Sequence, residues 1–263
     1  MKDVAIFIPT RNVGNALAVT LDRIPNDVKT QVGEIFVIDN DSEDDTYRIG
    51  VEYKKKNQLP NLNVYKNDKN LGMGGSEKKA FEYVINKNLK FIISLHGDAQ
   101  YAPESIKDIL KPLQKGEADF VFGTRMLGNP LKGGMPFWRF FGNKVLTRIG
   151  NLILGLNLTE LHSGFRAFNV ETLKKIPFKA LSNDYHFDHE MIILFALSKK
   201  KIVEIPIPTS YAEESTSPSV SQTIKYSSDV IYDLIKVVLH KCGINKQKKF
   251  NSINLIFQLL EIS

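Results

Sequence analysis

The stretch Lys90–Glu104, KFIISLHGDAQYAPE, decides the fold class of this chain. Its apolar run over residues 91–95 stops abruptly at His96-Gly97-Asp98, and Pro103 then opens a polar helix. Parallel strands that are buried on both faces have such continuous apolar runs, and open α/β sheets bind ligands at the carboxyl ends of their strands. An aspartate there, beside a glycine that permits close approach, can hold a divalent cation against a phosphate. Taken alone, the pattern also fits a solvated turn that Asp98 caps.

Strands alternate with helices on both sides of this stretch. We expect strands at Val4–Thr10, Glu34–Asn40, Leu62–Lys66, Phe91–Leu95 and Asp119–Gly123, and helices at Ala16–Ile24, Asp44–Lys56 and Gly72–Asn88. This βαβα order with short connections predicts an α/β fold. The sheet should be Rossmann-like, doubly wound and mostly parallel, with helices on both faces.

The pattern changes after Arg125. A loop over residues 127–136 precedes an amphipathic helix, Trp138–Leu156, and a helix at Met191–Leu197 and a strand at Ile202–Ile207 follow. The apolar face of the amphipathic helix either packs on the core or rests in a membrane interface. That face consists of Trp138, Phe141, Val145, Ile149, Leu152 and Ile153.

The chain is predicted to end in a helical appendage. We place a catalytic domain at residues 1–221 and an amphipathic, basic appendage at 222–263, with a helix near Ile224–Leu239 and an apolar-rich end at Ile253–Ile262. Part of the net charge of +6 gathers there, as Lys236, Lys241, Lys246, Lys248 and Lys249. This lysine cluster can meet an anionic membrane or remain a solvated tail. No stacking aromatic pattern accompanies it, which argues against nucleic acid.

Composition favours a cytoplasmic protein. The single cysteine, Cys242, excludes an intramolecular disulfide framework and every multi-cysteine metal site. The N-terminus enters a strand at once, without signal-peptide design, and no apolar run is long enough to cross a bilayer. We therefore expect a cytoplasmic protein that can associate peripherally with the inner face of the cell membrane.

A series of short motifs makes the prediction specific. In chain order they are IPTRN at residues 8–12, VIDNDSEDDT at 37–46, NLG at 70–72, HGDAQYAPE at 96–104, GTR at 123–125, SGFR at 163–166, and EIPI at 204–207 followed by Tyr211 and Ser215. Their order and spacing resemble the inverting family 2 glycosyltransferases of GT-A fold. Within this family the resemblance is to the branch that contains dolichyl- and polyprenyl-phosphate sugar synthases.

The resemblance implies a site for a nucleotide-diphosphate sugar, linked to UDP or GDP. The implied donor contacts are Pro9, Thr10, Asn12, Asp39, Asn70, Gly72, Asp98, Gln100, Arg125 and Arg166. Asp98 would hold Mg²⁺ or Mn²⁺, with His96 as a second candidate ligand. Asp39 would accept a base N–H or merely cap its turn. The two arginines would clamp phosphate oxygens or form surface salt bridges.

Three residues depart from the family pattern. His96 replaces the first acidic residue of the usual D-x-D, which leaves Asp98, substrate phosphates and water to hold a metal. Val13 stands where many relatives have glutamate, and Asn40 replaces the second aspartate of the base-binding turn.

The implied reaction is an in-line displacement at the anomeric carbon with inversion. A hydroxyl acceptor requires a general base, for which Glu160, Glu190 and, less directly, Asp188 are candidates. A lipid phosphate is already ionised, so these carboxylates would then orient other groups or bind metal. We therefore expect sugar transfer to a polyprenyl-phosphate or glycan acceptor in cell-envelope glycan synthesis.

Two alternatives stay open. A catalytically degenerate GT-A protein would bind nucleotide without turnover, as the departures at His96 and Val13 suggest. A sugar-nucleotide pyrophosphorylase shares the α/β architecture. Its glycine-rich loop after the first strand is missing here, because Gly14 is the single glycine among residues 9–14.

Overall fold

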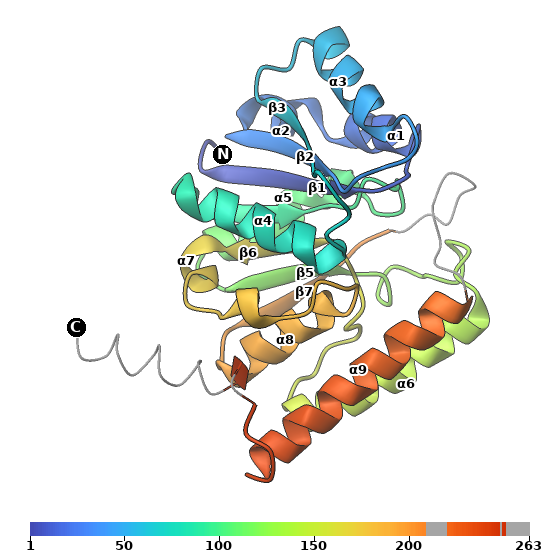
Figure 1. Ribbon diagram of the computed structural model, residues 1–263, viewed down its shortest axis with the longest axis vertical. Coiled ribbons are helices and arrows are strands. Elements are labelled where there is room, and N and C mark those ends of the chain that lie inside the picture. The colour runs from blue at the N-terminus through green and yellow to red at the C-terminus, as the bar shows by residue number, and fades with distance from the viewer. Residues whose placement is uncertain (209–219, 248, 251–263) are drawn as a thin grey trace, which may run out of the picture.

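The computed structural model describes residues 1–208, 220–247 and 249–250. In this part of the chain one sheet of seven strands forms the centre of the molecule, in the order β3-β2-β1-β4-β6-β5-β7 (Figure 1). The strands are β1 Val4–Thr10, β2 Glu34–Asp39, β3 Leu62–Lys66, β4 Phe91–Ser94, β5 Phe120–Thr124, β6 Arg166–Asn169 and β7 Ile202–Pro206. The predicted α/β class and mostly parallel sheet are confirmed.

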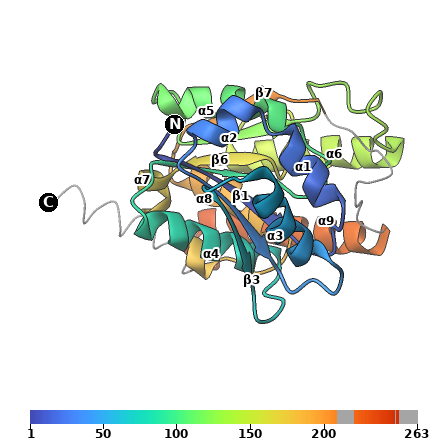
Figure 2. The same cartoon turned by 90° about the horizontal axis from the view of Figure 1, so that it is seen from above.

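Alternating side chains of the strands feed two apolar cores. In β1, Val4, Ile6 and Ile8 face one core, and Ala5 and Phe7 face the other. Helices cover both faces, as the view from above shows (Figure 2). The first face carries α1 Ala16–Arg23, α2 Asn26–Gln31, α3 Thr46–Asn57 and α5 Ile106–Gln114; the second carries α4 Met73–Asn86, α7 Val170–Leu173 and α8 Phe187–Leu197.

The sequence analysis did not predict one of the strands, β6. β6 runs antiparallel between β4 and β5, with Arg166 opposite both Ser94 and Phe122. At four residues, with an arginine at its start, β6 gives no apolar run of its own. The antiparallel direction matters for function, because it brings the start of β6 to the edge where the parallel strands end.

Two long helices lie beside the sheet and pack against each other: α6 Phe137–Leu154 and α9 Val220–Lys241 (Figure 1). α6 buries Thr147, Gly150 and Leu154. Most of its apolar side chains are exposed instead, from 42% for Val145 to 85% for Leu152. The interpretation that this apolar face packs on the core is therefore wrong, except for Ile153, which is partly buried.

α9 contributes buried side chains to the same core as α8, namely Val230, Leu234 and Val237. The proposed division of the chain at residues 221 and 222 stays a prediction. The predicted C-terminal segment at 253–262 lies outside the described residues. Within the described part, none of the helices combines the length and apolar character that a membrane span requires.

Candidate active site

The carboxyl ends of β1, β2 and β4 meet at one edge of the sheet. Thr10 lies opposite Asp39 in the β1–β2 register. Beyond β4, the Gly97 amide still donates to the Pro9 carbonyl at 3.3 Å, so the HGD turn lies directly against the end of β1. A side chain at Gly97 would meet Thr10 Cγ2 at 2.6 Å, which explains why this position is glycine. The sheet thus brings the IPTRN, VIDN and HGD motifs together.

Asp39 is fully buried at the end of β2. One of its carboxylate oxygens accepts from the Ser42 hydroxyl and the other from the Ser42 amide at 3.3 Å. These contacts are those of a turn-capping aspartate. The neighbouring loop is tied in through Asn12, whose Oδ1 accepts from the Glu43 amide at 2.8 Å. A contact between Asp39 and a base stays a prediction.

Asn40 joins the turn after β2 to the NLG loop. Its Oδ1 accepts from Asn67 Nδ2 at 3.0 Å and from the Leu71 amide at 2.9 Å, while its Nδ2 donates to Asn70 Oδ1 at 2.9 Å. An aspartate has no donor for the last contact, so the departure from the family pattern has a structural reason. Gly72 has φ +77°, and a Cβ there would overlap the backbone carbonyl of Asn183.

The proposed metal ligands follow β4. Asp98 is half-buried, and its Oδ1 accepts from the Gln100 amide at 3.1 Å, as in the capping interpretation of this turn. The Nε2 atom of His96 is buried and has no hydrogen-bond partner among the described residues. This nitrogen lies against Gly164, where an added Cβ would come within 2.5 Å of it. Imidazole nitrogen and carboxylate oxygen are ligand types that suit Mn²⁺, and Mg²⁺ accepts a single carboxylate when phosphates and water complete its shell. By ligand type, these residues fit a divalent ion.

Arg125 and Glu160 form a buried ion pair. Arg125 Nε donates to Glu160 Oε1 at 2.7 Å, and the Arg125 backbone amide donates to Oε2 at 2.8 Å. The adjacent residue Thr159 is fixed in turn, because its amide donates to the Glu204 carboxylate at 2.9 Å. Arg125 is 6% and Glu160 0% exposed, so the surface salt-bridge interpretation of Arg125 is wrong. Glu160 orients Arg125 and is already occupied by hydrogen bonds.

Arg166 is also buried, and the surface interpretation is wrong for it too. Its Nε donates to the Ser163 carbonyl at 2.7 Å, its Nη1 donates to the Asp188 carbonyl at 2.5 Å, and the Asp188 carboxylate lies 3.6 Å away. Its Nη2 has no hydrogen-bond partner in the described part of the chain. The buried Glu77 of α4 lies in the same electrostatic environment.

Neutral aromatic and histidine side chains lie near these charges. The Tyr101 hydroxyl accepts from the Gly164 amide at 2.8 Å, and His162 Nδ1 lies 3.0 Å from the Tyr226 hydroxyl of α9. Burial, together with the positive charge of Arg166, lowers the pKa of His189 to about 3. Burial likewise lowers the pKa of His162, and both rings are therefore neutral near pH 7.

The structure thus gathers most predicted residues at one edge but gives Glu190 other partners. Glu190 accepts from the Ser182 amide at 2.6 Å and pairs with Lys249. Sequence reasoning missed Glu77, Tyr101 and Tyr226. A carboxylate in the otherwise apolar stripe of α4 was a signal for Glu77, whereas nothing local marked the other two. Tyr211 and Ser215 lie outside the described residues.

The sheet topology, with the predicted donor residues gathered at one edge, fits a nucleotide-sugar transferase of GT-A type. The model of glycosyl transferase family 2 matches residues 5–177, which is more than half of the chain. The chain belongs to this family and is a glycosyltransferase. The family match favours the glycosyltransferase over the alternative of a pyrophosphorylase.

Two relatives and one solved structure illustrate the similarity. The undecaprenyl-phosphate mannosyltransferase of Micrococcus luteus is 29% identical over 78% of this chain and 82% of its own. The UDP-N-acetylglucosamine–dolichyl-phosphate N-acetylglucosaminyltransferase of Methanococcus voltae is 24% identical over 91% and 98%. The glucosyl-3-phosphoglycerate synthase of Mycobacterium tuberculosis, crystallised with Mn²⁺, UDP and phosphoglyceric acid, has the same fold, with a TM-score of 0.68, 16% identity, and coverage of 93% and 80%.

Proposed function

We propose that this enzyme transfers a sugar, with inversion, from a nucleotide-diphosphate donor to a polyprenyl phosphate. The observation that carries the proposal is the buried guanidinium of Arg166, whose Nη2 has no hydrogen-bond partner among the described residues. A buried donor without a partner costs about 1–3 kcal/mol or more when it is charged, and a phosphate oxygen would relieve this cost. Two relatives named for polyprenyl-type phosphate acceptors support the assignment.

The donor occupies the edge formed by β1, β2 and β4 in this proposal. Asp98 and His96 would hold Mg²⁺ or Mn²⁺, which supplies positive charge to the departing diphosphate when bound. Thr10 and Asn12 border the space for the nucleotide, and Asp39 contacts the base. UDP in the structural neighbour's crystals favours uridine as the base.

We assign Arg125 and Arg166 to the acceptor phosphate, although the resemblance implied donor contacts for both. Because a phosphate monoester is ionised near pH 7, it attacks the anomeric carbon without a general base. Glu160 then has a positioning role, since its two oxygens fix the Arg125 guanidinium and backbone amide. Asp188 positions Arg166 in the same way, with its carboxylate 3.6 Å from Nε.

The exposed apolar faces of α6 and α9 would rest on the membrane that holds the lipid acceptor. Trp138 is 51% and Leu152 85% exposed on α6, and Tyr232 is 60% exposed on α9. Between the helices lies a groove of about 260 Å³ lined by aliphatic side chains, including Ile149 and Ile235. Exposed apolar side chains gathered on one pair of helices suit the headgroup boundary.

The proposal is tested with the full-length protein, a panel of UDP- and GDP-sugars, Mg²⁺ or Mn²⁺, and polyprenyl phosphate present or absent. We expect metal-dependent nucleotide release that the lipid stimulates. Asp98→Asn should abolish this release, whereas Asp108→Asn, an exposed aspartate of α5, should leave it unchanged.

Two results would contradict the proposal. Nucleotide release that lipid does not stimulate would redirect the search to a glycan acceptor. Nucleotide binding without release from any donor would support the catalytically degenerate alternative.

A further inference from the structure

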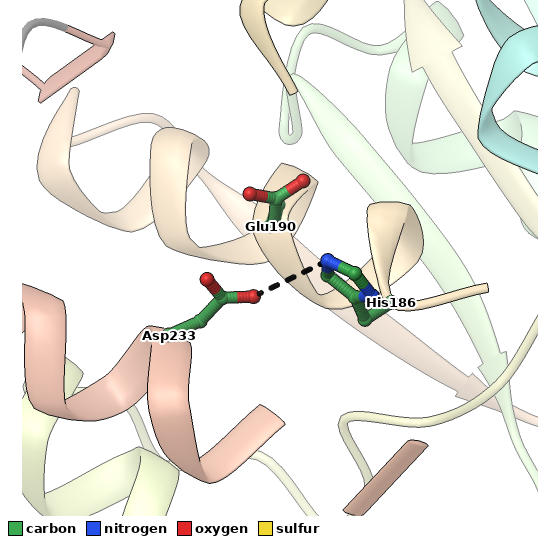
Figure 3. Close-up of side chains that lie close together, drawn as sticks. All are labelled: His186, Glu190 and Asp233. Atoms are coloured by element: carbon green, nitrogen blue, oxygen red, sulfur yellow. Dashed lines mark ion pairs between the residues drawn. The ribbon is translucent and has the colours of Figure 1, made fainter. Parts of the chain in front are cut away.

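A second group of possible metal ligands lies where α8 meets α9, outside the proposed donor and acceptor contacts of the arginines. It consists of His186, Glu190 and Asp233, whose candidate ligand atoms all lie within 4.8 Å of one another (Figure 3). His186 immediately precedes α8 and Glu190 follows one turn later, so the two side chains share a helix face. Asp233 reaches them from α9.

Both carboxylates are buried, with Glu190 3% and Asp233 1% exposed. Two buried carboxylates at this distance repel each other and need a cation between them. A lysine ammonium already has this position: Lys249 Nζ pairs with Glu190 Oε1 and lies 3.9 Å from Asp233 Oδ1. Lys236 Nζ also lies 3.1 Å from Asp233 Oδ1.

These ion pairs of the two lysines do not include Asp233 Oδ2 or the imidazole of His186. Asp233 Oδ2 is buried without a hydrogen-bond partner among the described residues, and it lies 4.0 Å from His186 Nε2. The other ring nitrogen of His186, Nδ1, lies 3.4 Å from the Asp229 carboxylate and has no hydrogen-bond partner among the described residues. A metal-binding histidine usually donates this N–H to a carboxylate, so the contact with Asp229 would have to shorten when a metal binds. The unpartnered oxygen and the imidazole face each other as two ligands without an ion.

We propose that His186, Glu190 and Asp233 bind a divalent transition-metal ion of the Zn²⁺ class, which displaces the ammonium of Lys249. Imidazole with two carboxylates suits Zn²⁺ better than Mg²⁺ or Ca²⁺, which prefer oxygen ligands alone. A tetrahedral ion with bonds of about 2.1 Å holds its ligand atoms about 3.4 Å apart. Because the ligand atoms now lie within 4.8 Å of one another, the cluster needs to close by up to about 1.4 Å, within reach of side-chain rotation.

Displacement of Lys249 gives the site a structural consequence. The adjacent Phe250 is 3% exposed and its ring lies 5.2 Å from that of His240 on α9. Lys249 and Phe250 together hold this part of the chain, beyond the end of α9, against the body of the protein. Zinc binding would therefore break the ion pair between Lys249 and Glu190 and leave the packing of Phe250 on His240.

The test measures zinc binding by equilibrium dialysis with the chelator-treated, full-length Asp98→Asn protein, in which the predicted donor-site ligand is absent. We expect one Zn²⁺ per chain. Adding Asp233→Asn should weaken binding at least about tenfold, whereas adding Lys249→Met should strengthen it about tenfold because the competing ammonium is gone. Lys225→Met, at an exposed lysine paired with Asp184, is the matched control and should change nothing.

Circular dichroism identifies any variant that fails to fold. If Asp233→Asn unfolds the chain, His186→Gln provides the same comparison at a side chain that is less buried. Cobalt should also give the visible absorption of a tetrahedral site in the Asp98→Asn protein and lose it in the His186→Gln form. Absence of stoichiometric zinc, or zinc affinity unchanged by Lys249→Met, would overturn the proposal.

Discussion

The protonation state of the buried Glu77 carboxyl can be tested through the pH dependence of protein stability. It is 2% exposed on α4, and its Oε1 accepts from the Ser94 hydroxyl at 2.6 Å. Its Oε2 has no hydrogen-bond partner among the described residues. Burial raises the pKa of Glu77 to about 8, and the nearby Asp188 carboxylate adds to the shift. We therefore expect Glu77 to be protonated in the folded protein near pH 7.

The magnitude and sign follow from linkage. Between about pH 4.5 and 8 the unfolded chain releases the Glu77 proton while the folded chain keeps it, so this group lowers the free energy of unfolding as pH rises. The slope is about 1.4 kcal/mol per pH unit, and the full difference between 4.5 and about 8 gives an upper limit of about 5 kcal/mol. Glu77→Gln keeps the shape and removes the titration.

Urea unfolding at several pH values between about 5 and 9 measures the effect. The Glu77→Gln protein should gain stability relative to the wild type as pH rises, by at least about 2 kcal/mol over the series. Glu82→Gln, on the same helix but paired with Lys179 at the surface, is the control and should follow the wild-type curve. Parallel curves for Glu77→Gln and wild type would refute the buried neutral carboxyl.

Three further substitutions test backbone strain, sugar transfer and membrane binding separately. Gly72→Ala should cost about 2–4 kcal/mol in chemical denaturation, because φ is positive and a backbone carbonyl fills the space; Gly116→Ala, with positive φ but open space, should cost only about 1 kcal/mol. Arg125→Lys should reduce kcat/KM about 10- to 100-fold in the transfer assay, since lysine lacks the guanidinium fork. Leu152→Glu should weaken binding to anionic vesicles about tenfold in sedimentation, whereas Val19→Glu on α1 should not.

The sheet edge formed by β1, β2 and β4 could be predicted from the sequence because its information is local. β1 and β3 have the predicted bounds, Val4–Thr10 and Leu62–Lys66, since each is an apolar or alternating run between turn residues. In a parallel sheet the residue after each strand must lie at the same edge. The gathering of Thr10, Asp39 and Asp98 therefore follows from strand order alone.

The surroundings of Arg125 and Arg166 depend on contacts between residues far apart in the chain. Arg125 and Glu160 are 35 positions apart, and nothing in either motif shows that each carboxylate oxygen would be bonded to Arg125. β6 can be recognised as a strand only from its pairing with β4 and β5. The orientation of α6 was ambiguous for a different reason: an amphipathic pattern reveals an apolar face but not what covers that face.

The buried groups of the site share one electrostatic pattern, which bears on the need for a metal. Arg125 is paired with Glu160 and Arg166 with Asp188, while the shifted pKa values leave Glu77 and His189 neutral near pH 7. Each shift reduces the number of unpaired charges in a region where an unpaired charge is costly. These groups therefore contribute almost no net positive charge, although the reaction releases an anionic diphosphate. In our proposal a divalent ion at Asp98 supplies the positive charge that this balance lacks, and the arginines orient phosphate oxygens rather than neutralise them.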